Sequence, residues 1–118
     1  MRQFLISIMF IMTLAACNKN SSTSTVSGLY IENSPINGRS QLNFINGNLV
    51  IKTETGSNYA DTFRYSITTA KIILTPNWTT QYSAQEFDFT KIDDRSFKIQ
   101  NLYPSIPENP KTYMIFKR

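Results

Sequence analysis

Residues 41–51 read Gln41-Leu42-Asn43-Phe44-Ile45-Asn46-Gly47-Asn48-Leu49-Val50-Ile51, two apolar-polar runs around Asn46-Gly47. Asn-Gly is the preferred pair for a two-residue type I′ turn, because both central residues need a positive φ. Such a turn pairs apolar residues across the strands: Phe44 with Leu49, and Leu42 with Ile51. The polar residues then share the other face: Gln41, Asn43 and Lys52. This stretch predicts an antiparallel hairpin with one apolar face.

The chain from Gly28 onward continues the same period of two, with turn residues near Thr69-Ala70 and Asp93-Asp94. Large apolar residues are expected on the inner face: Leu42, Phe44, Leu49, Ile51, Phe63, Tyr65, Ile67, Ile72, Leu74, Phe87, Phe89, Phe97 and Ile99. The stretch carries no convincing helical stripe. We predict an all-β domain, a small antiparallel up-and-down barrel of about eight strands, with a small β-sandwich as the alternative.

The size of the domain limits what its interior can hold. A barrel of about eight strands is just wide enough to be filled by side chains or to hold one small ligand. Because the expected inward residues are large, we expect a packed interior rather than a deep pocket.

The N-terminus has the order of a secretory signal. Met1-Arg2-Gln3 gives a basic start, and an uncharged apolar run extends from Phe4 to Ala16. At about 1.5 Å rise per residue this run is too short to cross a hydrocarbon core of about 30 Å. It has the length of the apolar region of a signal peptide. The run ends in Leu14-Ala15-Ala16-Cys17, which resembles the lipobox of bacterial lipoproteins.

The lipobox resemblance implies that a peptidase cuts before Cys17 once that cysteine is linked to diacylglycerol. The small residues Ala15 and Ala16 fit a narrow protease site, and Leu14 fits the apolar position three before the cysteine. The alternative is a free cysteine buried on an ordinary apolar helix. Because one acyl chain binds membranes only marginally, the two or three chains of such an anchor, palmitate among them, hold a protein stably.

The predicted organisation follows from this signal. Residues 1–16 form the lipoprotein signal peptide, residues 17–27 a lipid-attached flexible tether, and residues 28–118 the barrel domain. In the lipoproteins that the signal resembles, an aspartate after the cysteine often marks inner-membrane retention. Asn18 stands there instead, which favours the outer membrane of a bacterial cell envelope.

The start of the barrel domain carries a second resemblance. Gly28-Leu29-Tyr30 resembles the Gly-x-Trp start of lipocalins, with Tyr30 in the aromatic position. Arg118, just after the last expected strand, matches the basic residue that packs over that aromatic. The strand pattern of residues 28–118 is similar to that of small bacterial lipocalin-like lipoproteins. The chain departs from lipocalins in having Tyr for Trp and in being much shorter.

The composition excludes several kinds of chemistry. The chain has 118 residues, no His and one Cys, so it has no imidazole-based catalysis, disulfide framework or thiolate zinc cluster. The 12 basic and 8 acidic residues give a net charge of +4. Basic residues form no run, so nucleic acid is not an expected partner. No cofactor and no metal are expected. We read Glu86 and Asp88 as a solvated outer face and Asp93-Asp94 as a turn.

Loop aromatics are the candidate binding residues: Trp78, Tyr82 and Tyr103. Exposed aromatics beside amides suit stacking on a sugar or contact with a partner. The alternative for Trp78 is a plug over one barrel end. The Pro-rich stretch 102–110 is stiff, because proline fixes φ, and it presents Tyr103 and Ile106 or tucks them inward.

The sequence therefore predicts a lipid-anchored, extracytoplasmic, non-enzymatic lipoprotein. Its lipocalin-like domain is expected to bind a small apolar ligand or an envelope component, and its lipid on Cys17 to bind the membrane. The alternative is a protein-binding module, such as an inhibitor of a lysozyme or protease, that uses the loop at 102–110.

Overall fold

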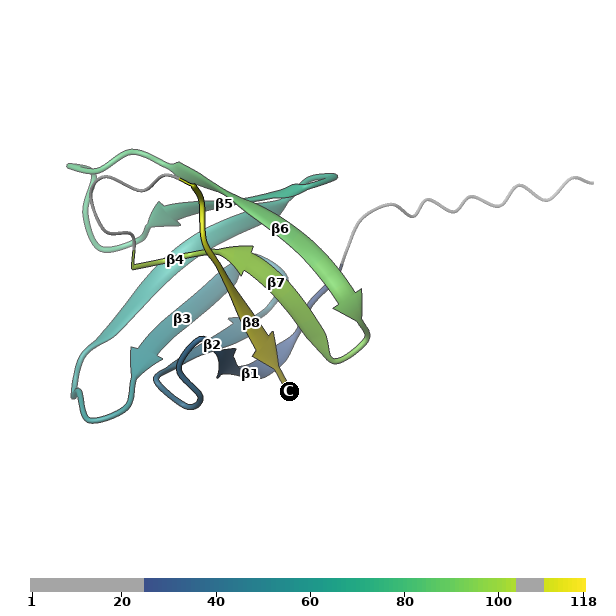
Figure 1. Ribbon diagram of the computed structural model, residues 1–118. Coiled ribbons are helices and arrows are strands. Elements are labelled where there is room, and N and C mark those ends of the chain that lie inside the picture. Colours follow the sequence, from purple (N-terminus) through teal and green to yellow (C-terminus); the bar gives the residue numbers. More distant parts are fainter. Residues whose placement is uncertain (1–24, 104–109) are drawn as a thin grey trace, which may run out of the picture.

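The computed structural model describes residues 25–103 and 110–118 (Figure 1). The lipobox at 14–17 and Ile106 lie outside the described residues. The described strands are β1 Gly28–Ser34, β2 Ser40–Ile45, β3 Leu49–Glu54, β4 Ala60–Ile67, β5 Lys71–Pro76, β6 Gln85–Asp93, β7 Ser96–Gln100 and β8 Tyr113–Lys117. Each strand pairs antiparallel with the next, and β8 pairs with β1, which closes the barrel. The predicted eight-stranded up-and-down barrel is confirmed, and the β-sandwich alternative is wrong.

The β2–β3 hairpin differs from its prediction by one residue. Asn46 and Gly47 have the expected positive φ angles of 58° and 77°. Ile45 pairs with Leu49, however, so the loop contains three residues rather than two. The true pairs across the hairpin are Phe44 with Val50 and Leu42 with Lys52. A shift of one residue turns every side chain of β3 to the other face.

This shift corrects the expected faces of three β3 residues: Leu49 and Ile51 were expected inside the barrel and Lys52 outside. Leu49 and Ile51 are half-buried and face outward, whereas Val50 is buried and Lys52 faces inward. Leu49, Val50 and Ile51 are all apolar, so alternation does not say which of them points into the barrel. The extra loop residue decides it.

The barrel core is aromatic and centres on Phe97. Its ring centroid lies 4.8 Å from Tyr30, 5.0 Å from Phe89, 5.4 Å from Phe116 and 5.9 Å from Phe44. The remaining predicted inner residues are confirmed as buried or packed against the core: Leu42, Phe44, Phe63, Tyr65, Ile67, Ile72, Leu74, Phe87, Phe89, Phe97 and Ile99. The core also contains residues that the prediction missed: Val26, Tyr30, Val50, Met114 and Phe116.

The two ends of the barrel differ. At one end, which we call the turn end, short connections follow β2, β4 and β6. At the other, the loop end, longer connections span residues 35–39, 55–59, 77–84 and 101–112. In Figure 1 the loop end lies on the left and the turn end on the right. The aromatic core fills the half of the barrel nearer the turn end.

The chain enters the barrel at the turn end. Val26 is buried, although we expected residues up to 27 to form the tether. The Thr25 carbonyl accepts a 3.2 Å hydrogen bond from Lys91, and the Ser27 carbonyl accepts one of 2.9 Å from Arg118. The guanidinium carbon of Arg118 lies 5.7 Å from the centre of the Tyr30 ring. The predicted packing of Arg118 over Tyr30 is therefore present.

Candidate functional site

Trp78 and Tyr82, two of the predicted binding residues, lie on the loop that joins β5 to β6 at the loop end. Trp78 is 55% exposed, and its ring packs edge-on against Phe63 at 5.3 Å. Tyr82 is 63% exposed. Neither expectation for Trp78 describes it fully, because the ring leans on an inner residue of β4 but leaves more than half of its surface in solvent.

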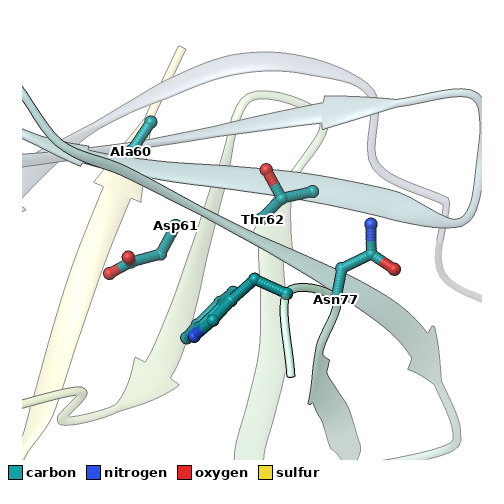
Figure 2. A pocket seen from close by; sticks show the side chains of 5 residues that line it. Ala60, Asp61, Thr62 and Asn77 are labelled. Carbon is teal, nitrogen blue, oxygen red and sulfur yellow. The ribbon is translucent and has the colours of Figure 1, made fainter. Parts of the chain in front are cut away.

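Trp78 also lines a shallow hollow at the rim of the barrel. The hollow has a volume of about 380 Å³ and is formed by β4 residues 60–62 together with Asn77 and Trp78. Figure 2 shows Asp61 and Thr62 pointing to opposite sides of β4, as neighbours on a strand do. The hollow therefore combines one aromatic ring with polar side chains.

A second feature, the loop-end cavity, lies inside the barrel. Its volume is about 140 Å³. Apolar side chains provide most of its lining: Leu42, Phe63, Leu74, Phe87 and Leu102. Lys52 and Gln85 add polar groups. The barrel is thus packed near the turn end but keeps a small apolar space at the loop end.

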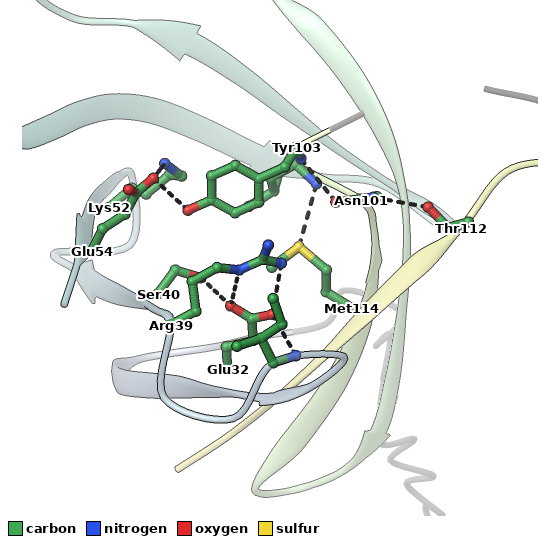
Figure 3. A network of polar contacts seen from close by, with 11 residues as sticks. Glu32, Arg39, Ser40, Lys52, Glu54, Asn101, Tyr103, Thr112 and Met114 are labelled. Carbon is green, nitrogen blue, oxygen red and sulfur yellow. Dashed lines mark hydrogen bonds and ion pairs between the residues drawn. The ribbon is translucent and has the colours of Figure 1, made fainter. Parts of the chain in front are cut away.

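Tyr103, the third predicted residue, lies beside this cavity rather than with Trp78. Its hydroxyl donates a 2.7 Å hydrogen bond to Glu54, which also pairs with Lys52 at 3.1 Å (Figure 3). The Lys52 ammonium and the Arg39 guanidinium carbon lie 4.6 Å and 4.3 Å from the centre of the Tyr103 ring. Two cations and one carboxylate therefore hold the ring in place.

The environment keeps Lys52 charged. Burial alone would lower the pKa of the Lys52 ammonium, but its interactions with Tyr103 and Glu54 outweigh burial and raise that pKa. The hydrogen bond from Tyr103, followed by that from Lys52, lowers the pKa of the Glu54 carboxyl. Burial, then the bond to Glu54, raises the pKa of the Tyr103 hydroxyl. The loop-end cavity therefore has a cation and a neutral phenol at its edge.

Below Tyr103, Glu32 is fully buried and is held by four hydrogen bonds (Figure 3). Arg39 donates two, at 2.9 Å and 2.8 Å, one to each carboxylate oxygen. The Ser40 hydroxyl and the Ile36 amide donate the others, at 2.9 Å and 3.2 Å. Bidentate pairing of this kind fixes geometry as well as charge. It positions Arg39 under the Tyr103 ring.

Glu32, Arg39 and Lys52 are not among the site residues predicted from the sequence. Side chains of a strand alternate between its two faces, so Glu32 shares the inner face of β1 with Tyr30. This alternation could have identified Glu32 from the sequence. Lys52 was assigned to solvent because of the incorrect hairpin register. A charged residue at an inward position was the feature that would have revealed the cluster.

One residue of each acidic pair, Asp88 and Asp93, has a structural role. Asp88 accepts bonds from Lys71 at 2.8 Å, Tyr113 at 3.0 Å and Lys111 at 3.2 Å. These groups, Lys71 foremost, lower the pKa of the Asp88 carboxyl to about 2. Asp93 accepts 2.8 Å bonds from the Arg95 amide and the Ser96 hydroxyl, as a turn-forming Asp does.

Comparisons of this chain with protein-family models, curated proteins and solved structures find no match. Within residues 25–103 and 110–118 we find no helix long and apolar enough to cross a membrane. The same residues contain no group of three or more His, Cys, Asp or Glu side chains placed to hold a metal ion. The inhibitor alternative depends on the loop at 102–110, and residues 104–109 lie outside the described part of the chain, so it stays a prediction.

Proposed function

We propose that this protein is a lipid-anchored lipoprotein of the bacterial envelope whose lipocalin-like barrel binds small apolar molecules at its loop end without catalysing a reaction. The loop-end cavity carries the proposal: it is lined mainly by apolar side chains and bordered by Lys52. Binding sites of small molecules are typically apolar spaces with a few polar groups that fix orientation.

The size of the cavity limits the ligand. At about 140 Å³ it is close to a dry engineered cavity of about 150 Å³ that binds benzene. It accepts a group of about six carbons rather than a whole lipid. Because Lys52 and Gln85 are its polar lining residues, the ligand that fits best has a short apolar chain and an anionic head.

The position of the N-terminus supports the membrane part of the proposal. Residues 25–27 pack at the turn end, and they follow the lipobox and the predicted tether. A lipid on Cys17 would therefore leave the barrel from the turn end. The loop-end cavity would then open away from the membrane, toward soluble ligands. The contact between Arg118 and Tyr30 supports the lipocalin-like part.

Hexanoate should bind in the loop-end cavity with a dissociation constant on the order of 1 mM. The test uses the chain from residue 17 onward with Cys17→Ser. Because this variant carries no lipid, it needs no detergent, and no detergent molecule competes with hexanoate for the cavity. We expect saturable NMR shifts of the methyl groups of Leu42, Leu74 and Leu102. Leu74→Trp should abolish the shifts by filling the space, whereas Leu29→Trp on the outer face should leave them unchanged. Shifts confined to outward methyl groups would contradict the proposal.

Cys17→Ser should remove the protein from the membrane. In bacteria fed radiolabelled palmitate, we expect the wild-type chain to carry label and to partition into the detergent phase after extraction. The Ser variant has no thiol for a thioether link, so it should carry no label and stay in the aqueous phase. Ser22→Ala in the predicted tether is the matched control. Labelling of the Ser variant at the wild-type level would show that Cys17 is not the attachment site.

A further inference from the structure

The loop end has a second recognition feature that the cavity does not use. Trp78 is 55% exposed and borders two hollows. The first is the hollow of about 380 Å³ described above. The second, of about 520 Å³, is lined by Arg64, Pro76, Asn77, Thr79 and Thr80. Trp78 and Asn77 border both hollows. We therefore call these two hollows the Trp78 hollows.

Backbone hydrogen bonds hold this region in place. The Asn77 amide donates a 2.9 Å bond to the Thr62 carbonyl, which extends the β4–β5 pairing beyond the end of β5. The Gln81 amide donates a 2.9 Å bond to the Thr79 hydroxyl, which orders the following turn. The ring of Trp78 also rests on Phe63. A ligand would therefore meet a preformed surface, which lowers the entropy cost of binding.

The polar side chains of the first hollow are available to a ligand. Among the residues that the structure describes, the side chains of Asp61, Thr62 and Asn77 have no hydrogen-bond or ion-pair partner. Asp61 supplies a carboxylate on the side of β4 where Trp78 packs against Phe63, whereas Thr62 and Asn77 supply a hydroxyl and an amide on the opposite side (Figure 2). Arg64 adds five N–H donors in the second hollow.

This combination matches the chemistry of a sugar chain. A pyranose ring with equatorial substituents presents C–H groups on its faces, which stack on an aromatic ring, and hydroxyls at its edge, which bond to amides, hydroxyls and carboxylates. A protein partner would instead favour an apolar, water-excluding surround of the aromatic anchor. Asp61 disfavours phosphate, and therefore nucleic acid, in the first hollow.

We infer that Trp78 is the stacking platform of a binding site for a β-linked pyranose chain, with successive sugars in the Trp78 hollows. Asp61 binds the hydroxyls of the sugar that stacks on Trp78. The polar side chains on the opposite side of β4 and in the second hollow bind those of its neighbour: Thr62, Asn77, Arg64 and Thr79. This site is separate from the loop-end cavity, so it goes beyond the proposed binding of apolar molecules.

Co-sedimentation with insoluble polysaccharides tests the site. The full chain, purified in a detergent without a sugar headgroup, is mixed with peptidoglycan sacculi, chitin or cellulose and pelleted. We expect saturable pelleting with at least one polymer, and the polymer that binds identifies the source of the sugar chain. Trp78→Ala should weaken binding about 10-fold, as loss of a stacking ring does. Leu29→Ala, which removes another exposed apolar side chain, should have no effect.

A second variant is needed because Trp78 contacts Phe63, so Trp78→Ala can reduce binding by destabilising the fold. Asn77→Ala removes a polar group that borders both hollows without touching the core, and it should weaken binding several-fold while the thermal unfolding curve stays unchanged. Saturating hexanoate should leave pelleting unchanged, because it occupies the loop-end cavity and not the sugar site. The two proposals can therefore be contradicted independently of each other. Absence of pelleting with all three polymers, or pelleting that Trp78→Ala and Asn77→Ala both leave unchanged, would overturn the inference.

Discussion

Replacing Phe97 by alanine should lower the free energy of unfolding by about 3–5 kcal/mol. Phe97 is fully buried, and its ring touches four other aromatic rings of the core. Alanine removes the ring and leaves a cavity, because a closed barrel cannot collapse around the gap without breaking its strand pairs. A domain of this size has only about 5–15 kcal/mol of stability, so the variant should be partly or fully unfolded at 37 °C.

Urea unfolding, followed by circular dichroism at equilibrium, measures the effect. Phe97→Leu keeps most of the buried volume and should cost clearly less than the alanine variant. Leu29→Ala is the matched control, because Leu29 is 45% exposed on β1 and its truncation should change stability by no more than about 0.5 kcal/mol. A loss below about 1 kcal/mol for Phe97→Ala would mean that the aromatic cluster does not hold the barrel together.

The barrel was predictable from the sequence because most of its strands have one apolar face. On β4, the alternation of Phe63, Tyr65 and Ile67 with polar residues leaves a single choice of inner face, and the structure has that choice. On β3, three consecutive apolar residues allow both choices. There the loop geometry decided the register, and loop length is not encoded in the alternation.

The candidate site was predictable only in part. Tyr103 and Trp78 stood out as aromatics in loops, and both lie at the loop end. Glu32 was missed because isolated charged residues are assigned to solvent by default. Lys52 was missed because the predicted hairpin register placed it on the outer face. Their burial is possible only because Arg39 and Glu54 lie beside them after folding. Glu32 is on β1, and Arg39 is the last residue of the loop that follows β1. The lipobox at 14–17 stays a prediction from sequence.

The asymmetry of the barrel connects the two proposed binding functions. Short turns, the aromatic core and the chain entry occupy the turn end, while every long loop is at the loop end. The loop-end cavity and the Trp78 hollows therefore both face away from the proposed membrane anchor. An apolar ligand and a sugar chain would reach neighbouring sites on the same exposed rim, with Phe63 lining the cavity and supporting Trp78.

Replacing Glu32 by glutamine should lower the free energy of unfolding by roughly 2–4 kcal/mol. Glutamine has the same shape, but it loses the charge and one of the two oxygens that accept bonds from Arg39. Its amide group then points donors at the donors of Arg39. Removing one partner of a buried ion pair costs about 3–5 kcal/mol, and the 28% exposure of Arg39 lets water recover part of this. Urea unfolding measures the loss, and Glu86→Gln, on the exposed face of β6, is the control.

The effect of Glu32→Gln should also depend on pH. Burial alone would raise the pKa of the Glu32 carboxyl, but hydrogen bonds from Arg39, Ser40 and the Ile36 amide outweigh burial and lower that pKa below its ordinary value of 4.5. A carboxyl with a lowered folded pKa contributes stability that is fully present above the unfolded pKa and is lost as the pH falls through the folded pKa. The difference in stability between wild type and Glu32→Gln should therefore be constant near neutral pH and shrink below about pH 4.5.

Because both proteins share the titration of Asp88 and Glu54, the difference isolates Glu32. A difference that stays constant down to pH 3 would show that the charge of Glu32 does not contribute to stability, and that the loss in the variant comes from packing alone.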